Sequence, residues 1–286
     1  MTDLTQAAPL RTGASPEAIM SHYDMGEDFF KLILDPELIY SCALFDDGDT
    51  LAQAQVRKLD HHIEAAAAMG ATRVLDIGCG WGAMLRRLSD HAGVAHCTGL
   101  TLSPSQAKWI RDRPRNGLQV LEQDWRDHVP TAPYDAIISV GAFEHFVQKG
   151  LTRQQRLDTY RSFFEFCSRS LRPGGQMSLQ TIAYTQPTAL HPYLEEAFPE
   201  SDLPLVWEPI AAAEGHFRLI AMVDHGAHYE RTLKCWEDAL AMNHDKAVAL
   251  VGPVGLESFR RYLRLSRFGF KHGIVGLLRM SFVKRD

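Results

Sequence analysis

A short apolar run that ends in an acidic residue and alternating glycines constrains the fold more than any other feature. It covers Val74 to Gly82 and reads VLDIGCGWG. The apolar run predicts a buried strand, and the glycines predict a turn whose backbone can approach a ligand closely. A helical stretch follows to about Ala92, so the N-terminus of a helix points at the same place. Strand, glycine turn and helix in this order are typical of a βα unit in an α/β fold.

Strand-like and helix-like segments alternate along the rest of the chain. The other strand-like segments are 94–103, 118–125, 134–146, 176–184, 217–229 and 277–285. Helices of ten or more residues separate most of them, which predicts βαβ units and a parallel sheet. In such a sheet, ligands bind at the carboxyl ends of the strands, near the point where the strand order reverses.

The segments before this core predict a separate addition to it. Residues 1–16 are polar and interrupted by prolines and a glycine, which is typical of a flexible N-terminus. Helices are expected at 16–35 and 51–70, and together they predict an N-terminal helical cap over residues 17–70. Residues 71–286 then form the main domain.

One segment of the main domain is irregular. Residues 185–216 contain five prolines and read as an excursion with one or two short helices. The segment is too long for a simple connection, so it predicts a lid or part of a substrate pocket.

Composition excludes several classes of protein. The chain has 286 residues, 45% of them hydrophobic, and its 30 Lys and Arg against 35 Asp and Glu give a net charge of -5. This is ordinary globular composition, and the negative charge argues against a surface built for nucleic acid. The five cysteines are scattered, which favours neither a disulfide framework nor a metal site. No signal sequence or run of about 18 apolar residues is present, so we expect a soluble, cytoplasmic protein.

The charge is unevenly distributed. Residues 257–286 carry eight Lys and Arg against two acidic residues, which makes this stretch +6 and the rest of the chain -11. A solvated helix face is the ordinary interpretation. The alternative is a basic patch that attracts an anionic membrane surface or an acidic acyl carrier protein.

The glycine spacing argues against a nicotinamide-dependent oxidoreductase. Gly78, Gly80 and Gly82 do not fit the G-x-G-x-x-G pattern that suits a pyrophosphate. The second strand also ends in Leu100 and Thr101, with no acidic residue for a nicotinamide ribose.

The D-x-G-x-G-x-G pattern resembles class I S-adenosylmethionine-dependent methyltransferases. Further motifs resemble the cyclopropane-fatty-acid synthase family, and most closely its mycolic-acid cyclopropane synthase and methyltransferase branch. These motifs are His22-Tyr23-Asp24, Tyr40-Ser41-Cys42, Gly99-Leu100-Thr101-Leu102-Ser103, Gly141-Ala142-Phe143-Glu144-His145-Phe146 and His228-Tyr229-Glu230-Arg231-Thr232-Leu233. They follow the family's order from about residue 18 to 286. The resemblance implies a Rossmann-like class I methyltransferase fold, with a mostly parallel seven-stranded sheet and helices on both faces.

The resemblance also implies a cofactor, S-adenosylmethionine, and the residues that bind it, and it implies no metal. The positions that match cofactor-binding residues are Tyr40 and Ser41 at the methionine end, Asp76, Gly78 and Gly80 in the glycine loop, Thr101, Leu102 and Gln106 on the ribose side, and Asp124 and Trp125 at the adenine edge. Trp125 taken alone is better explained as a core aromatic, and Asp76 alone as a helix cap. Their places at the ends of strands favour the cofactor.

In this family a cis alkene attacks the sulfonium methyl, and the resulting carbocation is shielded from water and deprotonated. Cyclopropanating relatives use bound bicarbonate as the base, held by groups that match Cys42, Glu144, Tyr229 and a histidine. Here Gln180 occupies the histidine position. Glutamine can donate a hydrogen bond to an anion but cannot carry charge, so bicarbonate binding is expected to be weaker. Without the resemblance, Glu144 could be a helix cap and Tyr229 a core residue at the end of a strand.

The sequence therefore favours a methyltransferase that adds the methyl carbon to an unsaturated, apolar substrate such as an acyl lipid, forming a cyclopropane or a methyl branch. The alternative is a tailoring C-, N- or O-methyltransferase of a small natural product. Gln180 and a short 185–216 segment favour that alternative, whereas Cys42, Glu144 and Tyr229 favour the first. A lipid-binding module without activity is a third interpretation.

Overall fold

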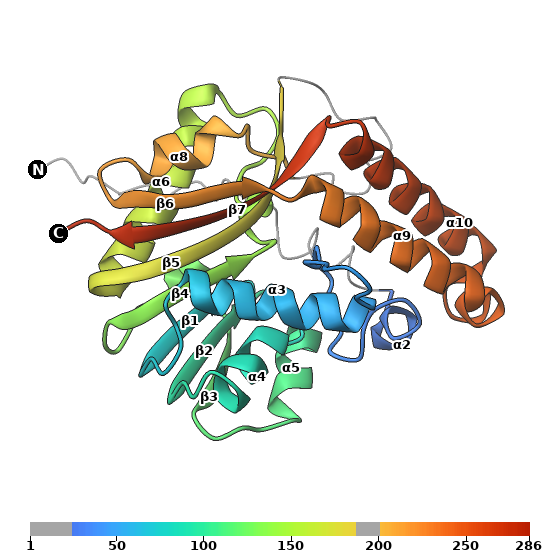
Figure 1. Cartoon of the computed structure of the whole chain (residues 1–286), viewed down its shortest axis with the longest axis horizontal. Helices are drawn as coiled ribbons and strands as arrows, with labels where there is room; N and C mark the ends of the chain where they lie inside the picture. The colour runs from blue at the N-terminus through green and yellow to red at the C-terminus, as the bar shows by residue number, and fades with distance from the viewer. Residues whose placement is uncertain (1–24, 187–200) are drawn as a thin grey trace, which may run out of the picture.

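The computed structural model describes residues 25–186 and 201–286, and a single sheet lies at its centre (Figure 1). The strands are β1 (Arg73–Ile77), β2 (His96–Thr101), β3 (Leu118–Glu122), β4 (Tyr134–Val140), β5 (Leu171–Tyr184), β6 (Phe217–Asp224) and β7 (Val275–Lys284). Their order is β3-β2-β1-β4-β5-β7-β6, and β7 alone of these runs antiparallel to its neighbours. The mostly parallel, seven-stranded sheet is thus confirmed.

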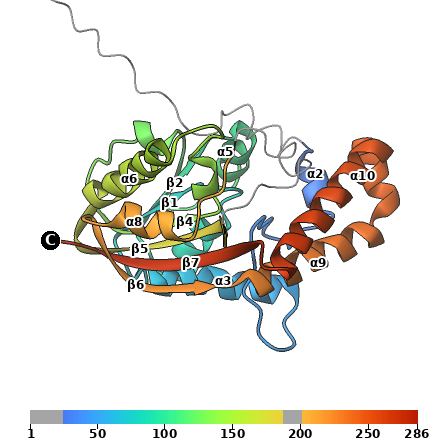
Figure 2. The same cartoon turned by 90° about the horizontal axis from the view of Figure 1, so that it is seen from above.

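Helices cover both faces of the sheet (Figures 1 and 2). The helices are α2 (Glu27–Phe30), α3 (Leu51–Ala65), α4 (Ala83–Asp90), α5 (Pro104–Arg111), α6 (Arg153–Ser170), α8 (Trp207–Ala213), α9 (Gly226–Met242) and α10 (His244–Lys271), with short 3-10 turns η1 (Trp125–Asp127) and η2 (Phe143–His145). Apolar residues of α3, α4 and α5 pack on one face, and those of α6 and α8 pack on the other. The antiparallel pair α9 and α10 extends beyond one end of the sheet, beside α2.

The strand order reverses between β1 and β4. The chain moves outward from β1 through β2 to β3 and then returns to β4 on the other side of β1. In register, Asp76 of β1 lies between Gly99 of β2 and Ile138 of β4. The loops that follow β1, β2 and β4 therefore start from the same edge of the sheet, where a parallel α/β fold places its ligand.

Residues 17–70, predicted as one helical cap, divide into two parts. Helix α3 packs on the sheet, and its His62 Nδ1 lies 2.8 Å from Ser178 Oγ of β5. Several buried residues described before it, among them Phe29, Phe30 and Cys42, pack instead against α9 and α10. Among the described residues of the predicted helix 16–35, only the single turn α2 is an α-helix, and it begins after Gly26, whose φ of 83° lies outside the helical range. Residues 1–24 lie outside the described part.

The predicted strand 217–229 is too long and is corrected here. Strand β6 ends at Asp224, whose Oδ1 accepts hydrogen bonds from the Gly226 N–H (2.8 Å) and the Leu277 N–H (2.9 Å). The Asp224 side chain thus accepts hydrogen bonds from backbone N–H groups at the end of the strand, and α9 begins at Gly226. Tyr229 therefore lies in the first turn of a helix.

The described part of the irregular segment 185–216 contains the short helix α8, as predicted, while residues 187–200 lie outside the description. Helix α8 packs on α6, where the Arg156 guanidinium donates to Glu208 Oε2 (2.8 Å) and to the Leu203 carbonyl (2.8 Å). Its role as a lid stays a prediction. Among the described helices, none combines the length and the apolar character needed to cross a membrane.

Candidate cofactor pocket and catalytic residues

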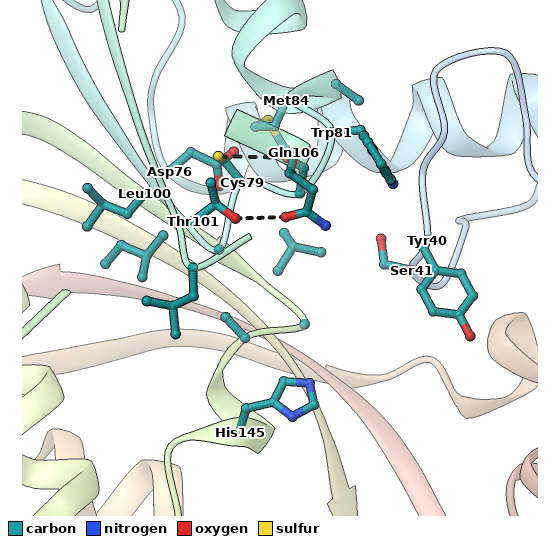
Figure 3. Close-up of a pocket in the computed structure, with 18 of the residues that line it drawn as sticks. Tyr40, Ser41, Asp76, Cys79, Trp81, Met84, Leu100, Thr101, Gln106 and His145 are labelled. Atoms are coloured by element: carbon teal, nitrogen blue, oxygen red, sulfur yellow. Dashed lines mark hydrogen bonds between the residues drawn. The ribbon is translucent and has the colours of Figure 1, made fainter. Parts of the chain in front are cut away.

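A pocket opens at the carboxyl ends of β1, β2 and β4 (Figure 3). All ten residues predicted to bind the cofactor line it: Tyr40, Ser41, Asp76, Gly78, Gly80, Thr101, Leu102, Gln106, Asp124 and Trp125. Other residues that sequence reasoning did not assign to it also contribute, among them Lys58, Gln123, Ala142 and His145. The predicted cofactor-binding residues that line this pocket are up to 85 positions apart in the sequence, from Tyr40 to Trp125.

The glycine turn has the backbone that its sequence predicts. Gly78 and Gly80 have φ of 79° and 53°, and the Leu100 carbonyl of β2 accepts hydrogen bonds from the N–H groups of Gly78 (3.0 Å) and Cys79 (2.9 Å). A Cβ on Gly78 would lie 2.5 Å from the Ala142 Cβ, whereas one on Gly80 would meet no atom within 4 Å. Gly78 is therefore required by packing, and the open side of Gly80 leaves room for a ligand.

Asp76 presents an unsatisfied oxygen in the wall of this pocket. The residue is 2% exposed, and its Oδ2 has no hydrogen-bond partner among the described residues. Burial raises the pKa of this carboxyl to about 7, an effect that the Lys58 charge opposes. A buried acceptor without a partner is rare, so Asp76 suits a donor or a cationic group of a bound ligand.

Lys58 of α3 is a pocket residue that the sequence analysis missed. It is buried, its Nζ donates to Ser41 Oγ (2.9 Å), and burial together with the Arg279 charge lowers its pKa to about 7. The sequence spacing could have indicated that Lys58 is buried, because it is four residues from both Ala54 and His62, which share the buried face of α3.

The residues predicted to contact the ribose and the adenine differ in how much of each side chain is free to meet a ligand. The Thr101 hydroxyl donates to Gln106 Oε1 (2.7 Å). The amide nitrogen of Gln106 points away from Thr101 and can donate to a ligand (Figure 3). Trp125 is also a core residue, since its ring packs against Phe146 (5.4 Å) and Phe163 (5.3 Å) between centroids. It therefore forms both the pocket wall and part of the core, and adenine contact stays a prediction.

The four predicted catalytic residues are buried just behind this pocket, and none is among the residues that line it. Glu144 Oε2 accepts from the Thr181 hydroxyl (3.1 Å), and its Oε1 accepts from the Ile182 N–H (3.5 Å). Burial raises the pKa of the Glu144 carboxyl to about 7. Burial also raises the pKa of the Cys42 thiol to about 12, so this cysteine is not an activated nucleophile.

Tyr229 and Gln180 lie in α9 and β5, so neither belongs to the turn that holds Glu144. The Tyr229 ring lies 4.6 Å from Phe270 and 6.1 Å from Trp236, and the pocket residue Tyr40 stacks on the same Trp236 at 5.0 Å. Gln180 precedes Thr181 in β5, so the two side chains point to opposite faces of the sheet. Thr181 meets Glu144, while Gln180 Oε1 accepts from Arg279 Nε (2.8 Å). Among the described residues, no hydrogen bond joins any two of these four, so their assembly into one catalytic site stays a prediction.

Comparison with known proteins gives consistent matches. The family model described as mycolic acid cyclopropane synthetase matches residues 11–280. Cyclopropane mycolic acid synthase 3 of Mycobacterium tuberculosis is 36% identical over 291 residues, covering 93% of this chain and 96% of that protein. Hydroxymycolate synthase MmaA4 of Mycobacterium bovis is 31% identical, with coverage of 97% and 95%.

Solved structures agree with this result. The cyclopropane synthase MmaA2 of Mycobacterium tuberculosis superposes with a TM-score of 0.86 at 30% identity, covering 97% of this chain and all of that one. The mycolic acid cyclopropane synthase CmaA1, complexed with SAH and CTAB, gives 0.81 at 30% identity, with coverage of 95% and 99%. Coclaurine N-methyltransferase, at 22% identity and a TM-score of 0.76, shares the fold.

Proposed function

Since this chain belongs to the mycolic acid cyclopropane synthetase family of S-adenosylmethionine-dependent methyltransferases, we propose that it methylates a carbon–carbon double bond in an apolar chain. The product is a cyclopropane or a methyl branch. The observation that carries this proposal is Glu144, a buried carboxyl with a pKa of about 7 beside the pocket. A carboxyl of that pKa can hold the anion that removes a proton from a carbocation and can exchange a proton with that anion near neutral pH.

The pocket residues fit the cofactor. The unpartnered Asp76 Oδ2 can accept a hydrogen bond from the cationic end of the cofactor. The open side of Gly80 leaves room for the part of the cofactor that would lie against the protein backbone, and the Gln106 amide can donate to the ribose of the cofactor. When bound, the cofactor supplies an electrophilic methyl group on a sulfonium. Tyr40 and Ser41 would hold its methionine end, next to Cys42 and the catalytic residues.

The surroundings of the catalytic residues suit an apolar substrate. Buried aromatic and aliphatic side chains of α2, α9 and α10 form one cluster, which includes Tyr229, Trp236, Leu263 and Phe270. Such a lining excludes water, and a carbocation needs that protection. The matched relatives carry names that place their substrates among mycolic acids, which are lipids with long chains. We therefore assign this chain an acyl-lipid substrate.

The proposal includes a small oxyanion, bicarbonate, as the immediate proton acceptor. Glu144, Tyr229, Cys42 and Gln180 are proposed to hold it, because they match the positions that hold the anion in the family. Gln180 offers a hydrogen bond where a histidine would offer a proton or a charge. Anion binding through these four groups alone is therefore weak.

The lipid is proposed to reach the enzyme at a membrane surface through α10. The basic stretch 257–286 is not one surface: Arg279 is buried, and Lys284 donates to the Leu171 carbonyl (2.7 Å). Arg261 and Arg264 are exposed on α10 and Arg260 is partly exposed, Arg264 pairs with Glu257 (2.7 Å), and Val254 of the same helix is 82% exposed. Arginines next to exposed apolar side chains on one helix favour an anionic lipid surface over an acidic acyl carrier protein.

The test is to incubate the protein with methyl-labelled cofactor and two acceptors, a cis-monounsaturated phospholipid and a polar aromatic amine. Label in the lipid alone is the expected result. Label in the amine and none in the lipid would establish the tailoring alternative instead. A cis double bond can be compared with the matching saturated lipid, which should remain unlabelled.

A further inference from the structure

Arg279 of β7 is a buried cation without a carboxylate partner. It is 3% exposed and, within residues 25–186 and 201–286, forms no ion pair. Its Nε donates to Gln180 Oε1 (2.8 Å), and its Nη2 donates to the carbonyls of Cys42 (2.9 Å) and Ala43 (3.1 Å). Its Nη1 is buried and has no hydrogen-bond partner in that part of the chain. Buried guanidinium groups are normally paired, so this one calls for an explanation.

The contacts of Arg279 fix the direction of the Gln180 amide. A guanidinium only donates, so the amide oxygen must be the atom that faces it. His62 Nε2 lies 3.3 Å from the same oxygen and must donate to it, so His62 Nδ1 accepts from the Ser178 hydroxyl (2.8 Å). Gln180 is 1% exposed, and its NH2 group is therefore held on the side away from Arg279. The direction of every donor in this network follows from one residue.

Five basic side chains from two helices feel the charge of Arg279. Lys58, His61 and His62 come from α3, and His225 and His228 lie at the start of α9. Burial and then the Arg279 charge lower the pKa of each of these five side chains. The interior at this point therefore already disfavours further cations, and an anion is the species that it would stabilise.

We infer that Arg279 is a positioning residue that aims the Gln180 amide and supplies the permanent positive charge of the oxyanion site. The inference rests on the proposed function, in which that site holds bicarbonate, and it adds how the site compensates for a missing histidine. Gln180 contributes the donor and Arg279 contributes the charge, through its free Nη1 beside Cys42. The pair faces one another across the β5–β7 ladder, where Gln180 and Arg279 are register partners.

The experiment measures bicarbonate binding without any substrate. The full-length protein saturated with S-adenosylhomocysteine is titrated with [13C]bicarbonate, and binding is followed by NMR line broadening. We expect Arg279→Met to weaken bicarbonate binding about tenfold or more, since a hydrogen bond to a charged group is lost. Arg279→Lys should recover part of that loss because it keeps the charge, and affinity for S-adenosylhomocysteine should stay within about twofold in both.

Controls separate this role from a structural one. Arg87→Met removes a guanidinium bonded to Asp60 in the α3–α4 contact (2.7 Å) and should leave bicarbonate binding unchanged. If Arg279→Met does not fold, Gln180→Leu provides the test, because it leaves the guanidinium in place and should still weaken binding. Bicarbonate binding that is unchanged in a folded Arg279→Met, or no better in Arg279→Lys than in Arg279→Met, would overturn the inference.

The two proposals fail separately. A wild-type protein that labels the lipid but does not bind bicarbonate overturns this inference and leaves the proposed methyl transfer intact. A protein that binds bicarbonate through Arg279 but labels no unsaturated lipid supports the anion site and removes the assigned substrate.

Discussion

At the scale of single residues, Glu144 makes the most specific prediction. Its pKa is raised from 4.5 to about 7 by burial, so between those values the folded protein holds a proton that the unfolded chain has lost. Stability from this group is therefore present at low pH and falls as pH rises through the window. Glu144→Gln does not titrate, so its stability relative to wild type should increase by roughly 1–3 kcal/mol between pH 5 and pH 8. Urea unfolding at both pH values measures this, and a difference that does not change with pH would contradict the assigned burial.

Asp76 makes a second prediction at this scale. The substitution Asp76→Asn removes the charge but keeps the size, so the unpartnered position can no longer attract a cation. We expect affinity for S-adenosylhomocysteine to fall by about tenfold or more, with the fold unchanged. Isothermal titration calorimetry provides the measurement, with exposed Asp90→Asn as the matched control. Equal affinities in the two variants would show that Asp76 serves only the turn.

Among the elements, the glycine turn after β1 was predictable in detail, and it carries its own prediction. Gly78→Ala would place a Cβ 2.5 Å from the Ala142 Cβ at a backbone φ of 79°. It should therefore destabilise the protein by roughly 1–3 kcal/mol and weaken cofactor binding. Gly80→Ala has space around its Cβ, so thermal unfolding should show a smaller loss. A larger loss for Gly80→Ala than for Gly78→Ala would show that the turn is packed differently.

The elements that the sequence did not predict depend on contacts between distant segments. Eight of the ten predicted cofactor residues lie at or just after strand ends, which local patterns indicate, whereas Tyr40 and Ser41 were assigned only through the family resemblance; all ten line one pocket. Tyr229 was assigned to a strand because part of the stop signal is a tertiary contact, the hydrogen bond that the Leu277 N–H of β7 donates to Asp224 Oδ1. Arg279 lies in a stretch predicted to be solvated, and only its pairing with Gln180 across 99 residues shows that it is buried. Local periodicity carries no information on which strands become neighbours.

For the whole molecule, the outer face of α10 predicts how the enzyme reaches its lipid. Replacing Arg260, Arg261 and Arg264 by Gln removes three positive charges from that helix. We expect binding to vesicles with anionic phospholipid to fall severalfold at low salt, and the wild-type protein to lose most of its binding at high salt. Vesicle sedimentation measures both. The variant Arg115→Gln, which removes a positive charge paired with Asp90 and outside α10, is the control. Wild-type binding that is insensitive to salt, or carried instead by an acidic acyl carrier protein, would contradict a membrane-docking face.

The central claim is that the methyl carbon is joined to a former double bond with Glu144 beside it. The most direct measurement uses cofactor with a 13C-labelled methyl group and a cis-monounsaturated phospholipid, and locates the labelled carbon in the product by NMR. We predict that it is bonded to the carbons of the original double bond, and that Glu144→Gln lowers the rate by about a hundredfold or more while cofactor affinity is kept. A labelled carbon attached to oxygen or nitrogen, or full activity in Glu144→Gln, would contradict this account.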